Sequence, residues 1–195
     1  MRSSADSAQA KGPNGRNETG EEIRETIDMI IRSETPDDED AIHLINAAAF
    51  APSSHANGTE AQIIRELRKD GDMTISLIAE DGGEIVGHIV FSPVAIGGRN
   101  DDWFGLGPLA VRPNAQRKGF GSALVKRGLT MLRERGAKGC ALLGNPAFYA
   151  RFGFESDGTI VFGDLPTRFV QRVVFAGKPP AGDLTYAPAF DLAKT

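Results

Sequence analysis

Alternation of apolar and polar residues predicts the strands of this chain. Ile27, Met29 and Ile31 place apolar residues at every second position, which is the period of a strand. The run TISLIAE, the turn DGG and the run EIVGHIVFSPV predict a hairpin over residues 74–94. Residues 140–144, CALLG, are wholly apolar, as in a strand buried inside a sheet. Further strands are expected at residues 103–111, 168–177 and 183–190.

Helical spacing and capping residues predict the helices. In the first predicted helix, Thr35 or Asp37 can cap the N-terminus and Pro36 suits the first turn. Its apolar residues Ile42, Ile45 and Ala49 fall on one face. Four helices are expected, at residues 35–50, 59–69, 122–135 and 147–152.

The order of these elements predicts an α/β fold of the mixed, α+β kind. A hairpin meander followed by a β-α-β unit gives a mixed sheet with helices on its faces. Residues 1–21 contain almost nothing to bury and are expected to form a disordered tail. Residues 22–195 are expected to form a single domain.

Composition narrows the possible functions. The chain has 195 residues, 41% of them hydrophobic and 25% charged, and a net charge of −4, which argues against a nucleic-acid-binding protein. The single cysteine, Cys140, cannot form an internal disulfide or a cysteine-based zinc site, and no metal site is expected. No signal peptide and no apolar run of bilayer length is found, so we expect a cytoplasmic protein without membrane contact.

The stretch RPNAQRKGFGSALV, residues 112–125, joins a predicted strand to a predicted helix. Backbone N–H groups at a helix start lack partners, and glycine lets a ligand approach them, so this loop suits a phosphate or pyrophosphate. Arg117 and Lys118 add positive charge. The alternative is an ordinary glycine-containing connection with solvated cations. The spacing matches neither a P-loop nor the dinucleotide-binding fingerprint.

Two sequence blocks resemble the GNAT superfamily of N-acetyltransferases. The block Leu109-Ala110-Val111-x-Pro113-x-x-Gln116-x-x-Gly119-x-Gly121 is similar to the family's coenzyme A loop. The block from Asn145 to Phe154, with Tyr149 followed by Gly153-Phe154, resembles its other signature. The resemblance spans residues 26–156 and is greatest to a bacterial branch of predicted acetyltransferases.

The resemblance implies a mostly antiparallel mixed sheet that splays at a coenzyme A site. It implies transfer of an acetyl group from acetyl-CoA to a primary amine of a small molecule or protein, by direct attack on the thioester. Backbone groups of one strand would pair with the pantetheine arm, and amides of the following loop would hold the pyrophosphate. The implied binding residues are Leu109, Ala110, Val111, Gln116, Arg117, Lys118, Gly119, Phe120, Gly121, Ser122, Asn145, Phe148 and Tyr149.

Two residues carry the implied chemistry. Tyr149 stands at the family position of the acid that protonates the coenzyme sulfur, and a neutral phenol can do this. The family has a bulge where this chain has Gly107-Pro108, which would aim the Leu109 N–H at the thioester oxygen. Packing among phenylalanines is the other interpretation of Tyr149. Helix capping is the other interpretation of Asn145.

The general base stays open at this point. The strand position at which many family members carry an acid is Gly107-Pro108 here. Candidates elsewhere are His88, His55, Glu60 and Asp101-Asp102, beside a water relay or an amine that arrives neutral. The polar segment 51–60 is expected to form one wall of the acceptor site.

Two other functions are kept as alternatives. A non-catalytic acyl-CoA sensor or assembly module would bind the coenzyme without turnover. The absence of an acid at Gly107-Pro108 is the reason to retain this hypothesis. A nucleotide phosphate-binding domain is disfavoured, because no magnesium-binding Ser or Thr follows a Gly-Lys pair. The resemblance also implies a possible homodimer, to which residues from Arg168 onward could contribute.

Overall fold

The computed structural model describes residues 28–50 and 59–194, and the structure below concerns those residues. The predicted tail, residues 1–21, and most of segment 51–60 lie outside them. The helices are α1 (Glu39–Phe50), α2 (Glu60–Lys69), α3 (Phe120–Glu134) and α4 (Pro146–Tyr149). The strands are β1 (Met29–Ser33), β2 (Ile75–Asp81), β3 (Glu84–Pro93), β4 (Ala95–Ile96), β5 (Trp103–Val111), β6 (Gly139–Leu143), β7 (Ile160–Val161), β8 (Val170–Val174) and β9 (Gly182–Thr185).

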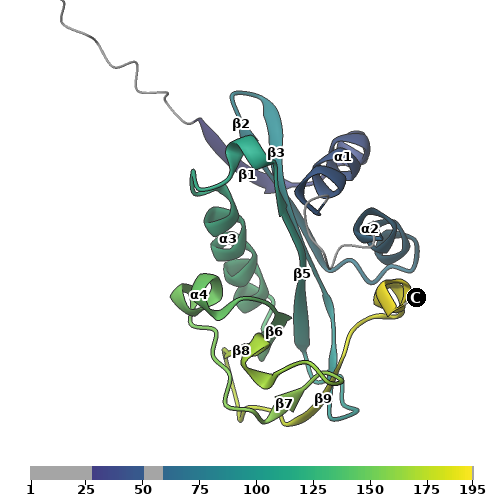
Figure 1. Cartoon of the computed structure of the whole chain (residues 1–195), viewed down its shortest axis with the longest axis vertical. Helices are drawn as coiled ribbons and strands as arrows, with labels where there is room; N and C mark the ends of the chain where they lie inside the picture. The colour runs from purple at the N-terminus through teal and green to yellow at the C-terminus, as the bar shows by residue number, and fades with distance from the viewer. Residues whose placement is uncertain (1–27, 51–58, 195) are drawn as a thin grey trace, which may run out of the picture.

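Six strands form the central sheet in the order β1-β2-β3-β5-β6-β8. All neighbours are antiparallel except β5 and β6, which are parallel. Helix α3 covers one face, and α1 and α2 cover the other (Figure 1). This arrangement confirms the predicted fold class. None of the helices in the described part of the chain is long and apolar enough to cross a membrane.

The amphipathic faces predicted from sequence are the faces that pack on the sheet. Helix α3 buries its predicted apolar residues against the sheet, and α2 does the same on the opposite face. In α1, Ile42 and Ile45 are buried, whereas Ala49 is only half-buried. The buried residues that match the prediction are Ile63, Ile64, Leu67, Leu124, Val125, Leu129 and Leu132.

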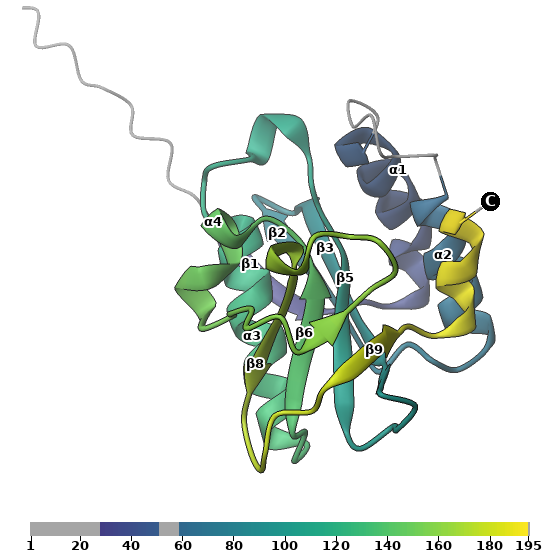
Figure 2. The same ribbon diagram turned by 60° about the horizontal axis from the view of Figure 1, so that its bottom comes forward.

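A second, three-stranded sheet has the order β4-β9-β7 and lies at the end of the molecule where β7 and β9 are labelled in Figure 1. This end faces the viewer in Figure 2, where β9 is labelled. Strands β4 and β7 are two residues long each. The sequence did not predict them, because two residues are too few to show an alternating pattern. After β9, the 3₁₀ helix Pro188–Lys194 runs beside α2 (Figure 1).

Strands β5 and β6 separate along their length. They pair only from Trp103 to Gly105, although β5 continues to Val111. On its other edge, β5 bulges against β3, because Ile89 pairs with Leu109 and Phe91 pairs with Leu106. Gly107 and Pro108 therefore share one position opposite a single residue of β3. The splay and the bulge lie side by side, as the family resemblance implies.

Candidate active site

The loop between β5 and α3 turns sharply before the helix starts. Arg117 and Gly119 have positive φ angles of 63° and 101°. Such angles are strained for a side-chain-bearing residue and easy for glycine, so Gly119 suits its place immediately before the helix. The Gln116 side chain donates a hydrogen bond from Nε2 to the Val111 carbonyl oxygen, 3.1 Å away, and ties the loop to the strand.

Helix α3 begins at Phe120, two residues earlier than predicted. Ser122 is a typical N-cap residue, but the cap here is Gly119 and Ser122 lies in the first turn. The N–H groups of the first turn have no partner within the helix, and no acidic side chain stands in that turn. The start of α3 is therefore an electropositive set of donors.

A cavity of about 480 Å³, here named the loop cavity, brings the two sequence blocks together. From the first block, Val111, Gly119 and Gly121 line it; from the second, Phe148 lines it. Arg151, which the sequence analysis did not single out, also lines it. The other lining residues are Leu109, Ala115, Gln116, Arg117 and Ser122.

Five predicted binding residues are not in the lining of the loop cavity: Tyr149, which is described below, and four others. Ala110 and Phe120 are buried, so only their backbone groups could serve a ligand. Lys118 is exposed. Asn145 caps α4, with its side chain accepting a hydrogen bond from the Ala147 N–H at 3.0 Å. The capping interpretation of Asn145 is thus confirmed, and its contact with a ligand stays a prediction.

Tyr149 lies at the end of α4, beside the splay. Its ring meets Phe148 edge-on with centroids 4.8 Å apart and Phe154 with centroids 5.8 Å apart. Gly144 leaves room for the ring, since a Cβ there would stand 2.5 Å from Tyr149 Cε2. Burial, with a smaller effect of Cys140, raises the pKa of the Tyr149 phenol to about 12. The phenol therefore keeps its proton throughout the physiological range.

A second cavity of about 370 Å³, here named the aromatic cavity, shares a lining residue with the loop cavity. Leu109 lines both cavities, Phe148 lines the loop cavity, and Tyr149 lines the aromatic cavity. The remaining lining residues are Phe50, Glu60, Ile63, Leu106, Gly107, Pro108, Leu143, Phe162, Tyr186 and Phe190. The two cavities thus meet at the bulged strand.

Tyr186 is a part of this site that the sequence reasoning missed. Its segment, residues 183–190, was predicted only as a strand. The ring rests on β5 at the start of the splay, because a Cβ at Gly105 would lie 2.5 Å from Tyr186 Cε1. Burial raises the pKa of its phenol. The chain has two tyrosines, and both line the aromatic cavity. The rarity of tyrosine was the signal in the sequence that could have pointed to Tyr186.

The candidate bases lie in different places. Asp101 and Asp102 precede β5 and face Arg99 and Lys138, at the opposite end of the strand from Leu109. His55 falls outside the described residues. Glu60 lines the aromatic cavity together with Tyr149. Of these candidates, Glu60 is the one that the described structure brings to the splay.

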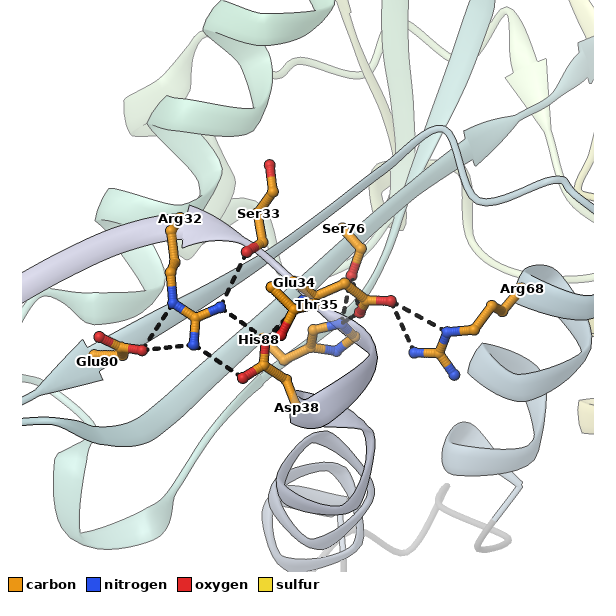
Figure 3. Close-up of polar contacts among 9 residues, drawn as sticks. All are labelled: Arg32, Ser33, Glu34, Thr35, Asp38, Arg68, Ser76, Glu80 and His88. Carbon is orange, nitrogen blue, oxygen red and sulfur yellow. Dashed lines mark hydrogen bonds and ion pairs between the residues drawn. The ribbon is translucent and has the colours of Figure 1, made fainter.

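His88 is fully buried beneath α1 and lines neither cavity. Asn46 Nδ2 lies 3.2 Å from its Nδ1, and Ser76 Oγ lies 2.9 Å from its Nε2. Ser76 in turn donates a hydrogen bond to Glu34, which pairs with Arg68 of α2 (Figure 3). Because the amide nitrogen can only donate, Nδ1 accepts and the ring is neutral. This cluster ties α1 and α2 to the sheet, so His88 serves the fold.

The His88 cluster predicts a pH dependence of stability. Burial lowers the pKa of His88 below its ordinary 6.5, so the folded protein holds the ring neutral where the unfolded chain takes up a proton. Stability is therefore complete above pH ~6.5 and falls as the pH drops, by up to about 1.4 kcal/mol per pH unit. Hydrogen bonds to Glu34, whose pKa is lowered to about 2, add a further loss below pH ~4.5.

Urea unfolding at pH values between 5 and 7.5 measures this effect. His88→Gln is expected to flatten the slope above pH ~5, where the carboxylates remain charged. His43→Gln, on the exposed face of α1, is the matched control and should keep the slope. An unchanged slope in His88→Gln would show that another group takes up the proton.

Comparisons with known proteins identify the family of this chain. The sequence model of the Acetyltransferase (GNAT) family matches residues 39–154. The N-acetyltransferase YhbS of Escherichia coli strain K12 is 38% identical over 128 residues, which cover 65% of this chain and 74% of that protein. The Escherichia coli relative YjhQ, also named an N-acetyltransferase, is 36% identical over 100 residues, covering 49% of this chain and 55% of that protein.

Solved structures of acetyltransferases from the same family are similar to this chain. A GNAT-family acetyltransferase from Brucella melitensis, crystallised with acetyl-CoA, is 42% identical, with a TM-score of 0.75 over 84% of this chain and 98% of that one. The Escherichia coli YhbS structure in complex with CoA has 31% identity and a TM-score of 0.77, over 85% of this chain and 93% of that one. The matched fold and the family match over more than half of the sequence define an acetyltransferase. The chain belongs to the GNAT family.

Proposed function

We propose that this chain transfers the acetyl group of acetyl-CoA to a primary amine by direct attack on the thioester. The observation that carries the proposal is the meeting of the loop cavity and the aromatic cavity at Leu109, beside Tyr149. A two-substrate reaction needs two sites that open onto one reacting centre. Holding both reactants there can supply roughly 7–11 kcal/mol of the activation barrier.

The loop cavity fits the coenzyme. The unpartnered N–H groups at the start of α3, together with Arg117, suit the two phosphates of its diphosphate. The pantetheine arm contains two amides, which can pair with the edge of β5 that the splay leaves open. Phe148 provides an apolar wall beside that arm.

The register of β5 supports Leu109 as the oxyanion donor. The Arg112 N–H donates to the Val86 carbonyl at 2.8 Å, so these two residues form a hydrogen-bonded pair of the antiparallel ladder. Such pairs alternate with pairs that are not hydrogen-bonded, and Ile89–Leu109 is three residues further along. The Leu109 N–H therefore points away from β3 and into the splay, toward the position of the developing negative oxygen.

Acetyl transfer also needs proton movements. The amine nitrogen forms a bond to the thioester carbon, the carbon–sulfur bond breaks, and the sulfur leaves as a thiolate. Tyr149 holds a proton at its phenol oxygen and can donate it to that thiolate. The nitrogen loses one proton to a base or to solvent, and the products are an amide and the free thiol of CoA.

Thiol release from acetyl-CoA in the presence of a panel of amines tests the proposal. Amine-dependent release, with formation of the N-acetyl product, supports the transferase. Tight CoA binding without turnover across the panel would instead support the alternative of an acyl-CoA sensor. ATP binding that CoA does not compete with would support a nucleotide-binding domain.

Three further expectations belong to this proposal. The chain from residue 22 onward is taken as one domain, although residues 22–27 lie outside the described structure. A cytoplasmic location fits the single cysteine, which is free and buried. The homodimer implied by the family resemblance stays a prediction, and light scattering behind a sizing column measures it.

A further inference from the structure

We infer that the acceptor is a monoamine with an aromatic or branched apolar body, and that Glu60 holds its ammonium group. This inference rests on the proposed function, because it assigns the aromatic cavity to the acceptor. It deepens that function by naming the substrate class and the side chain that selects the charge.

The walls of the aromatic cavity favour an apolar body. Phe162 and Tyr186 meet edge-on with ring centroids 6.1 Å apart, and Tyr186 and Phe190 are 4.7 Å apart. Ile63 of α2 and Leu143 of β6 contribute aliphatic surface. A volume of about 370 Å³ is in the range of small-molecule pockets. Moving a phenyl or branched alkyl group into such surroundings releases water from apolar surface on both partners.

The charge of the cavity favours one cation. Among the described residues that line it, Glu60 is the one charged side chain. It is half-buried at the first position of α2 and lines the cavity. A second ammonium group, as in a polyamine, would lie against aromatic and aliphatic walls without a carboxylate partner, which is unfavourable. The same cost applies to the polar backbone of a peptide acceptor.

Glu60 also has a place in the proton balance of the reaction. An ammonium ion cannot attack, because its nitrogen has no free electron pair. It must lose one proton to become the nucleophile and a second as the amide forms, while the leaving thiolate gains one from Tyr149. A carboxylate beside the nitrogen can receive a proton and pass it to solvent.

A panel of acceptors tests the substrate class. With acetyl-CoA, 2-phenylethylamine and 3-methylbutylamine are expected to give kcat/KM at least about tenfold above spermidine and above a lysine-containing peptide, a difference of ~1.4 kcal/mol. A preference for spermidine or the peptide would overturn the inference and leave the transferase standing. No turnover of any amine, with CoA still bound, would overturn the proposed function instead.

A charge test isolates Glu60. N,N-dimethyl-2-phenylethylamine is cationic at pH 7. It cannot serve as an acceptor, because acetylation of a tertiary amine would not give a neutral amide. This ligand therefore measures binding alone. Glu60→Gln should weaken its binding about tenfold, as expected for a charged hydrogen bond, and leave the binding of neutral 2-phenylethanol unchanged. Glu66→Gln is the matched control, because Glu66 lies on the same helix, pairs with Lys69 and lines neither cavity.

The two ligands separate a role in charge recognition from a role in folding. A structural defect in Glu60→Gln would weaken both the cation and the alcohol and would contradict the assignment. Equal binding of the cation to Glu60→Gln and to the wild-type protein would contradict it as well. The assignment is supported if Glu60→Gln loses affinity for the cation alone and Glu66→Gln binds both ligands as the wild-type protein does.

Discussion

Tyr149→Phe is expected to lower kcat by about 100-fold or more while CoA binds almost as before. The substitution removes the phenol proton and leaves the ring and its contacts with Phe148 and Phe154 in place. General acid catalysis is worth roughly 10² to 10⁴ in rate. Single-turnover measurements of amide formation, together with calorimetric titration of CoA, separate the chemical step from binding.

The pH profile provides a second measurement of Tyr149. Because burial raises the pKa of its phenol to about 12, the acid form persists well above the ordinary value of 10. Ionisation of Tyr149 should therefore cause no loss of rate near pH ~10 in the wild-type protein. The pH profiles of the wild type and of Tyr149→Phe should have the same shape in that range. A variant that turns over at the wild-type rate would leave Tyr149 as a packing residue and assign the proton to water.

Gly121→Asp is expected to abolish coenzyme binding, with a dissociation constant at least about 100-fold higher, or ~2.7 kcal/mol. Gly121 lies in the first turn of α3 and lines the loop cavity. An aspartate there sets a negative charge against the diphosphate, and like charges brought together cost several kcal/mol. Titration with CoA at fixed ionic strength measures the loss.

The structure also provides the control for Gly121→Asp. A Cβ at residue 121 would lie 3.5 Å from Val111 Cγ2 and 3.8 Å from Phe148 Cζ, which is ordinary contact. Gly121→Ala should therefore fold normally and bind CoA more tightly than Gly121→Asp does. Unimpaired CoA binding by the aspartate variant would mean that the diphosphate does not lie at this helix start.

Much of the fold could be predicted because its signals are local. The hairpin of β2 and β3 has a glycine turn between two apolar runs, and β5 falls where its apolar run predicts a strand. The start of α3 was two residues off, because the conformation of Gly119, rather than a serine side chain, provides the cap. The strands β4 and β7 depend on pairing with β9, a contact between segments far apart in the sequence.

The candidate site likewise has one part that the sequence could predict and one part that it could not. The residues of the loop cavity come from two short blocks with recognisable spacing, so the sequence could bring most of them together. The aromatic cavity combines α1, α2, β5, β6, α4 and the segments after α4, and no local pattern indicates that Phe162 or Tyr186 lines the same cavity as Glu60. The burial of a polar residue is equally invisible in sequence. His88 was a reasonable base until the structure placed it under α1, fully covered.

The wall formed by Tyr186 and Phe190 has a consequence for how the protein is made. Every residue that lines the loop cavity has been synthesised once the ribosome passes Arg151, whereas the aromatic cavity lacks a side until Phe190 has emerged. A nascent or C-terminally clipped chain would thus contain every residue that lines the loop cavity, while its aromatic cavity would be open along one side.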